Sequence, residues 1–228
     1  MNTMKRTSLA AVMATIFAGL TACGGGGGGS TASSGSYTPS STVQGVITNF
    51  GSVWIDGVEY ETNGAEIIID GRPGTEDDLD VGMYVTLTGS ADGASGQAVS
   101  IEFDDDIEGV VESVDAATGT LRVMGQNVVV DANTVIESDD GLAVAVADLS
   151  DLAQDHVVEV SGYNDGQGNI LATRIELKAR DLDEYRTRKG ESAEIEVKGV
   201  VSNVDPDNRT FKLGGLTVEV PADVSMPA

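Results

Sequence analysis

The chain has few of the residues on which most catalytic and metal sites depend. Its 228 residues include one cysteine, one histidine and only 4% aromatic residues. A single cysteine excludes an intrachain disulfide, and one cysteine with one histidine is too few for a zinc or copper site. A Ser-His-Asp arrangement would need His156, which stands at the start of an expected strand with no nucleophile motif nearby. The sequence also contains no P-loop or dinucleotide fingerprint.

Positive charge is nearly absent from the first three quarters of the chain. Between Cys23 and Thr173 the only cationic side chains are Arg72 and Arg122, against 26 aspartates and glutamates, and the formal net charge is −24. Such a surface repels phosphate backbones and concentrates cations, so no nucleic-acid partner is expected. The same acidity is also explained by solubility in a salty environment, with no site at all.

The first 22 residues have the features of an export signal. Two basic residues precede an apolar run from Leu9 to Leu20, which is too short for a permanent membrane span. The following Leu20-Thr21-Ala22-Cys23 resembles the bacterial lipobox. This resemblance implies that Cys23 is acylated and anchors the protein through its lipid, and Gly24 in place of aspartate points to the outer membrane. Residues 23–42 are rich in glycine and serine and predict a flexible tether.

Short alternating runs separated by glycine turns predict β structure in the rest of the chain. The chain has 29 glycines, which suit many strands joined by tight turns. Asp56-Gly57 stands between two alternating runs and predicts a two-residue type I′ turn with positive φ at both positions. Residues 43–104 are expected to form the first β-barrel module.

Residues 105–178 repeat this plan as a second module. Strands are expected at 109–115, 120–124, 127–131, 156–162 and 170–177. The segment between the third and fourth of them predicts a short helix that begins near Ala147, with Asp148 as its cap. Three strands, a linking segment and two more strands are the order of an OB-like five-stranded barrel.

The C-terminal part begins with a charged joint at residues 179–195. Arg186, Arg188 and Lys189 make it the one local basic patch, and it is interpreted as a solvated linker or helical spacer. Residues 196–228 repeat only the first three strands of the module. We expect this partial module either to dock on the second barrel or to accept strands from a protein partner at its edge, in preference to the third explanation, a boundary that cuts a module short. The predicted class is therefore all-β, with tandem small OB-like five-stranded β-barrel modules, the third incomplete.

Several motifs resemble those of bacterial envelope proteins that carry domain of unknown function 5666. They are G-V-V-E-S-V-D from Gly109, T-L-R-V-M-G-Q-N-V-V-V-D from Thr120, A-T-R-I-E from Ala172 and K-G-V-V-S-N-V-D from Lys198. The similarity extends over nearly all residues from Val43 onward. It implies small β-barrel modules on lipoproteins of Gram-negative bacteria, and it implies no catalytic residues.

The acidic run between the first two modules departs from that pattern. Asp104, Asp105, Asp106 and Glu108 lie at the joint, where a bound cation would relieve repulsion. Calcium takes six to eight oxygen ligands in irregular loops, so these four residues are candidate calcium ligands, although their spacing does not match an EF-hand. No other cofactor is expected.

The sequence therefore predicts a non-enzymatic cell-envelope lipoprotein that acts as a binding or scaffold module for an unknown ligand. Its partners are the membrane, through the N-terminal lipid, and a protein at the edge of the third module. One alternative is a calcium-dependent adhesion or assembly module. The other is an enzyme that acts on envelope polysaccharide, because carboxylate pairs of the glycosidase kind stay open among 37 acidic residues. Small barrels are nevertheless expected to lack a deep cleft for a sugar.

Overall fold

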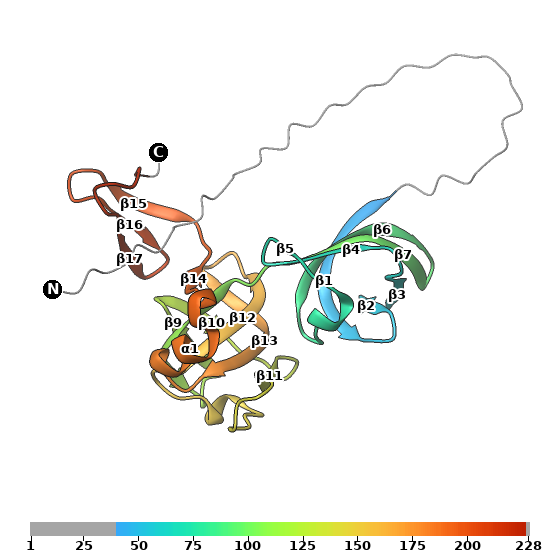
Figure 1. The fold of residues 1–228 in the computed structure, drawn as a ribbon, viewed down its shortest axis with the longest axis horizontal. Helices are drawn as coiled ribbons and strands as arrows, with labels where there is room; N and C mark the ends of the chain where they lie inside the picture. Colours follow the sequence, from blue (N-terminus) through green and yellow to red (C-terminus); the bar gives the residue numbers. More distant parts are fainter. Residues whose placement is uncertain (1–39, 227–228) are drawn as a thin grey trace, which may run out of the picture. The chain divides into compact units, whose positions relative to one another are not determined.

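The computed structural model describes residues 40–226 and is mostly β (Figure 1). The signal peptide, Cys23 and nearly all of the predicted tether lie outside the described residues. The helices among the described residues are too short or too polar to cross a membrane. Hydrogen-bonded strands form three sheets, of which two close on themselves.

The first sheet contains a ring of five strands, called barrel 1. Its elements are β1 (Ser41–Asn49), β2 (Val53–Ile55), β3 (Val58–Glu61), β4 (Glu66–Ile69), β5 (Arg72–Pro73), the 3-10 helix η1 (Glu76–Asp78), β6 (Tyr84–Asp92) and β7 (Ser95–Phe103). The sheet runs β3-β2-β1-β6-β7-β4-β5, and a parallel pairing of β3 with β7 closes the ring. Asp56 and Gly57 both have positive φ, at 51° and 79°, which confirms the predicted turn.

The first strand begins earlier than predicted. The predicted tether includes Ser41 and Thr42, yet these two residues pair with Gly89 and Thr88 of β6. These two residues join β1 because β6 extends past the partner of Val43 and offers backbone hydrogen-bonding groups opposite residues 41 and 42. The side-chain hydroxyls of Thr42 and Thr88 also lie 3.2 Å apart.

Alternation along the strands fills the interior of barrel 1. Ile47, Leu87, Ile101 and Phe103 are almost completely buried there. Burial of a side chain of this size contributes about 2 to 3 kcal/mol relative to exposure. Closure of the ring also leaves few unpaired edges, so a small core suffices to hold it.

The second sheet has the same order of pairings in its ring, called barrel 2. Its elements are β8 (Ile107–Asp115), β9 (Thr120–Val123), β10 (Gln126–Val129), β11 (Val135–Ser138), the 3-10 helix η2 (Leu149–Asp151), β12 (Val157–Asn164) and β13 (Asn169–Ala179). The sheet runs β10-β9-β8-β12-β13-β11, and a parallel pairing of β10 with β13 closes it. β11 continues the sheet by pairing in parallel with β13.

The linking segment of barrel 2 is less helical than predicted. Asp148 is the N-cap, as expected, and its carboxylate accepts a hydrogen bond from the amide of Ser150 at 2.8 Å. The helix is nevertheless a single 3-10 turn at Leu149–Asp151. Leu149 and Leu152 bury their side chains in the barrel core, so packing against the barrel ends replaces the longer helix.

The charged joint forms the only α-helix among residues 40–226, α1 (Leu182–Lys189), followed by the 3-10 turn η3 (Gly190–Ser192). Asp181 caps α1 by accepting from the amide of Glu184 at 2.8 Å. Tyr185 is its one buried residue and packs with Val157 and Ala179. The helix is therefore held by one aromatic anchor on an otherwise polar surface.

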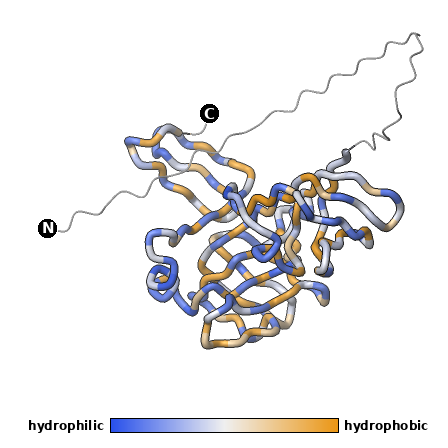
Figure 2. Tube along the Cα trace, turned by 45° about the vertical axis from the view of Figure 1, so that its right-hand side comes forward, coloured by the Kyte–Doolittle hydropathy of each residue, from blue (hydrophilic) through white to orange (hydrophobic). Residues whose placement is uncertain are grey.

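The third sheet starts later than its predicted boundary at residue 196. β14 (Glu196–Val197) pairs with β8 and so belongs to the sheet of barrel 2. β15 (Val201–Asp205), β16 (Thr210–Leu213) and β17 (Leu216–Glu219) then form a separate three-stranded sheet. Hydrophobic and hydrophilic residues alternate along these strands (Figure 2). Val200, which precedes β15, is 87% exposed.

Candidate binding face

The predicted calcium ligands are organised around a lysine. Asp104, Asp105 and Asp106 lie between β7 and β8. The ammonium nitrogen Nζ of Lys198 lies 2.6 Å from Oδ1 of Asp104 and 3.2 Å from Oδ1 of Asp105, and it also donates to the Asp105 carbonyl. A side-chain cation thus takes the position that the sequence suggested for a metal.

Glu108 does not join the three aspartates. It stands on β8 opposite Glu159 of β12 and Glu196 of β14. Within residues 40–226 no group of three or more acidic, histidine or cysteine side chains is placed to hold a metal ion. The structure therefore brings Asp104 and Asp105 together with Lys198, but it does not assemble the four predicted ligands.

Burial changes the titration of this joint. Desolvation raises the pKa of Asp105 to about 8, against the opposing effect of Lys198. Desolvation likewise raises the pKa of Asp106 to about 6. The amide of Asp105 donates to Oδ1 of Asp70 at 3.3 Å, and burial raises the pKa of Asp70 as well. The connection between β7 and β8 is therefore a desolvated cluster of aspartates, and Lys198 is its main counter-ion.

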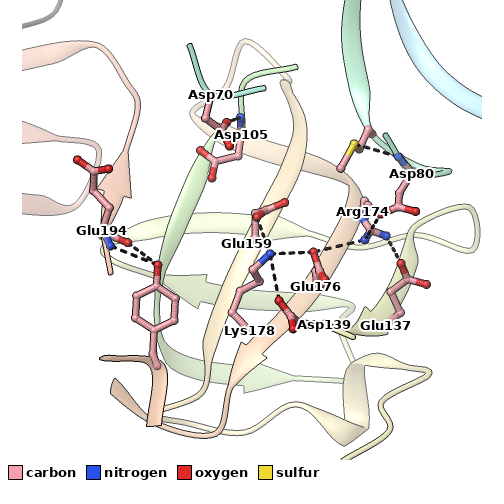
Figure 3. A network of polar contacts seen from close by, with 12 residues as sticks. Asp70, Asp80, Asp105, Glu137, Asp139, Glu159, Arg174, Glu176, Lys178 and Glu194 are labelled. Carbon is pink, nitrogen blue, oxygen red and sulfur yellow. Dashed lines mark hydrogen bonds and ion pairs between the residues drawn. The ribbon is translucent and has the colours of Figure 1, made fainter. Parts of the chain in front are cut away.

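A second charged network lies on the β11-β13-β12 side of barrel 2 (Figure 3). Lys178 Nζ lies 2.9 Å from Glu159 Oε2 and 3.1 Å from Glu176 Oε2, while desolvation raises the pKa of Glu176. Arg174 is 3% exposed and pairs with Asp80 at 3.1 Å and with Glu137. Strand register explains the density of charge, because Glu137, Glu176 and Glu159 stand directly opposite one another. Lys178 and Arg174 neutralise the three glutamates of that row, so both cations already have carboxylate partners.

Two further rows of side chains lie on the outer surface of barrel 2. Residues directly opposite in a sheet point to the same side, and their inward neighbours Leu121, Val123 and Val128 are buried. The first row crosses β8, β9, β10 and β13 and consists of Ser113, Arg122, Asn127 and Asn169. The second row lies two residues further along and consists of Asp115, Thr120, Val129, Leu171 and Tyr163. These nine residues are called the barrel-2 face.

Two depressions meet on the barrel-2 face. One has a volume of about 340 Å³ and is lined by residues of both rows, with Ser113 of β8 at one end and Asn169 of β13 at the other. The other has a volume of about 450 Å³ and extends past Tyr163 toward Val46 and Gly82 of the first barrel. Val129 lines both, so they adjoin across β10. Both volumes fall in the range of small-ligand sites.

Neighbouring contacts hold the barrel-2 face in shape. Arg122 Nε lies 2.8 Å from Oε2 of Glu112, and its Nη1 donates to Oδ1 of Asn127 at 3.0 Å. Glu112 in turn accepts from the amide of Gly125 at 2.7 Å. At the other end the rings of Tyr163 and Tyr84 are 5.4 Å apart and tilted by 39°. The guanidinium and the tyrosine ring are therefore preorganised.

His156 shows no catalytic arrangement in the described part of the chain. Its Nδ1 accepts a hydrogen bond from the amide of Ala153 at 3.1 Å, and burial lowers its pKa. The outward residues of β9 and β10 were visible as an alternating pattern in the sequence. The alignment of these residues into two rows cannot be read from the sequence. It depends on a bulge between Val111 and Ser113 that shifts the register between β8 and β9.

Comparison with known proteins adds a partial family match. A family model described as Domain of unknown function (DUF5666) matches residues 108–176, which include β8 except for its first residue, β9 to β12 and most of β13. The resemblance expected for residues 43–103 and 197–220 lies outside the matched range. No curated protein and no solved structure matches the chain.

Proposed function

We propose that the chain is a non-enzymatic cell-envelope lipoprotein, built of tandem OB-like barrels, that binds its ligand through the barrel-2 face. The observation that carries this proposal is the position of the first depression on both outward rows, with the second depression adjoining it at Val129, Leu171 and Tyr163. In five-stranded barrels with this order of strands, the face of the second and third strands and the adjoining loops is the usual binding surface. The N-terminal signal and Cys23 supply the address, an outer membrane to which the lipid anchors the protein.

A binding role agrees with the shape of the surface. The face combines amides, hydroxyls, one carboxylate and one ion-paired guanidinium with two aliphatic side chains and an exposed tyrosine, and both depressions are open to solvent. Such a surface suits reversible contact with an extended molecule better than enclosure of a reacting bond. The ion pairs of Lys198 with Asp104 and Asp105 favour this proposal over the calcium-dependent alternative.

The third sheet supports the scaffold part of the proposal. β15 and β17 pair only with β16 among residues 40–226, and small open sheets of this kind are marginally stable alone. Its β16–β17 turn contacts barrel 2, where Gln126 Nε2 donates to the Leu213 carbonyl at 2.8 Å. A protein partner at the β15 edge, where Val201 and Val204 are exposed, remains part of this proposal.

Site-specific photocrosslinking in the host cell tests the proposal. A photoreactive residue replaces Thr120 at the centre of the barrel-2 face, and a matched variant carries it at Val99, an exposed strand residue of barrel 1. The proposal predicts a discrete adduct from Thr120 and none from Val99. Equal adducts at both positions, or none at Thr120, would contradict it. Mass spectrometry of Cys23 in the same preparations checks the lipid anchor. An unmodified thiol would contradict the lipid-anchor part of the proposal.

A further inference from the structure

The first row of the barrel-2 face offers hydrogen-bonding groups to a ligand. Ser113 and Asn127 are exposed, and neither the Ser113 hydroxyl nor the Asn127 amide nitrogen has a hydrogen-bond partner in the described part of the chain. Both are held on rigid strands, so little side-chain entropy is lost when they bind. The row therefore presents neutral donors and acceptors on either side of Arg122.

Three members of the second row, Val129, Leu171 and Tyr163, form an apolar floor that ends in an aromatic ring. Val129 and Leu171 are half-buried and stand directly opposite each other. Tyr163 stands opposite Leu171, is 43% exposed, and is fixed from behind by Tyr84. The two rows are about 7 Å apart, because residues of one face repeat every second position along a strand. An apolar strip thus runs beside a polar strip.

The charges of the face select against anionic ligands. Asp115 lies in the first depression and Asp131 in the second. Arg122 is the one cationic side chain that lines either depression, and Glu112 already neutralises it. A phosphate or carboxylate group would meet two carboxylates and no free cation. Nucleic acids, acidic glycans and lipid headgroups that carry phosphate are disfavoured.

A molecule with hydroxyls along its rim and C–H groups on its flat faces matches this surface, and a sugar ring has that distribution. We propose that the barrel-2 face binds a neutral oligosaccharide. The hydroxyls face the Ser113–Asn127 row, and a ring face lies on Val129, Leu171 and the exposed side of Tyr163. This inference rests on the proposed function, since it names the ligand class of the same face.

Calorimetric titration of the full lipidated chain in detergent tests it. The probes are three neutral hexasaccharides, maltohexaose, laminarihexaose and chitohexaose, with hexagalacturonate as the anionic counterpart. At least one neutral probe is expected to bind, and hexagalacturonate is expected not to bind. Tyr163→Ala should weaken binding at least about tenfold, while Tyr163→Phe, which keeps the ring, should change it by less than about threefold. Asn127→Ala should weaken it, and Val99→Ala on barrel 1 should not. Thermal unfolding confirms that each variant is folded.

Three results would overturn the inference: no binding of any neutral probe, tighter binding of hexagalacturonate, or equal affinity for wild type and the Tyr163→Ala variant. These results leave the photocrosslinking test untouched, because an adduct at Thr120 reports any ligand on the face. A Thr120 adduct without sugar binding therefore removes the glycan and keeps the binding face. Absence of the adduct removes the proposed function itself.

Discussion

The ammonium nitrogen of Lys198 lies 3.2 Å from Oδ1 of Asp105, which joins the segment before the third sheet to the connection between the two barrels. Asp105 is almost completely buried, whereas Lys198 keeps part of its side chain in solvent. Burial raises the pKa of Asp105 to about 8, so removal of the lysine would leave a buried carboxylate without its counter-ion once Asp105 ionises above that pH.

Above pH 8, where Asp105 is ionised, Lys198→Met is therefore expected to destabilise the protein by about 2 kcal/mol, less than for a fully buried pair because Lys198 is partly solvated. Chemical denaturation followed by circular dichroism measures the loss. Lys212→Met is the matched control, since Lys212 is exposed and forms no ion pair within residues 40–226. Equal effects of the two substitutions would show that the Lys198–Asp105 contact contributes nothing specific.

The raised pKa of Asp105 predicts a pH dependence of stability. Its folded-state pKa of about 8 exceeds the ordinary value of 3.8, so the folded protein holds the proton more tightly than the unfolded chain does. The free energy of unfolding that Asp105 contributes therefore falls as the pH rises from about 4 to about 8. Asp105→Asn should flatten that part of the profile by on the order of a few kcal/mol. Asp104→Asn, at an exposed position, should leave the slope in place.

Lys178 is expected to be one of two sensitive cations of the Glu137–Glu176–Glu159 row, beside Arg174. It is 9% exposed and contacts two glutamates, so Lys178→Met should cost about 3 to 5 kcal/mol. Adding Glu159→Gln and Glu176→Gln to the same chain should restore much of the loss, because the uncompensated charges are then absent. A triple variant no more stable than Lys178→Met would contradict this account of the row.

Gly125 is predicted to control the contact between barrel 2 and the third sheet. Its φ is 76°, and a Cβ there would lie 2.4 Å from the amide nitrogen of Leu216. Gly93 has a similar φ of 63° with open space around it. Gly125→Ala should therefore speed hydrogen exchange at the Gly215 amide, which donates to the Gly125 carbonyl, and Gly93→Ala should not. Equal exchange in the two variants would remove the steric argument.

Local chemistry identified the turns and caps of this fold from the sequence. The Asp56-Gly57 turn and the Asp148 cap follow from the preferences of individual residues. The length of the helix after Asp148 does not follow from such preferences, because burial of Leu149 and Leu152 against the barrel decides it.

Contacts between distant residues account for what the sequence did not show. Lys198 is 93 positions from Asp105, and no local pattern relates them. The cross-strand rows depend likewise on strand register: a one-residue shift at the β8 bulge would move Ser113 out of line with Arg122. The candidate ligand surface therefore required the paired strands, whereas the lipid anchor at Cys23 stays a prediction from the sequence.

Methyl-detected NMR of the full chain in detergent tests the central claim most directly. The methyl signals of Val129 and Leu171 lie on the floor of the barrel-2 face, and those of Val99 and Val58 report on barrel 1. On titration with the neutral hexasaccharide of highest affinity, the account predicts saturable shifts of Val129 and Leu171 and unchanged positions for Val99 and Val58. Shifts centred on barrel 1, or none at Val129 and Leu171, would contradict it.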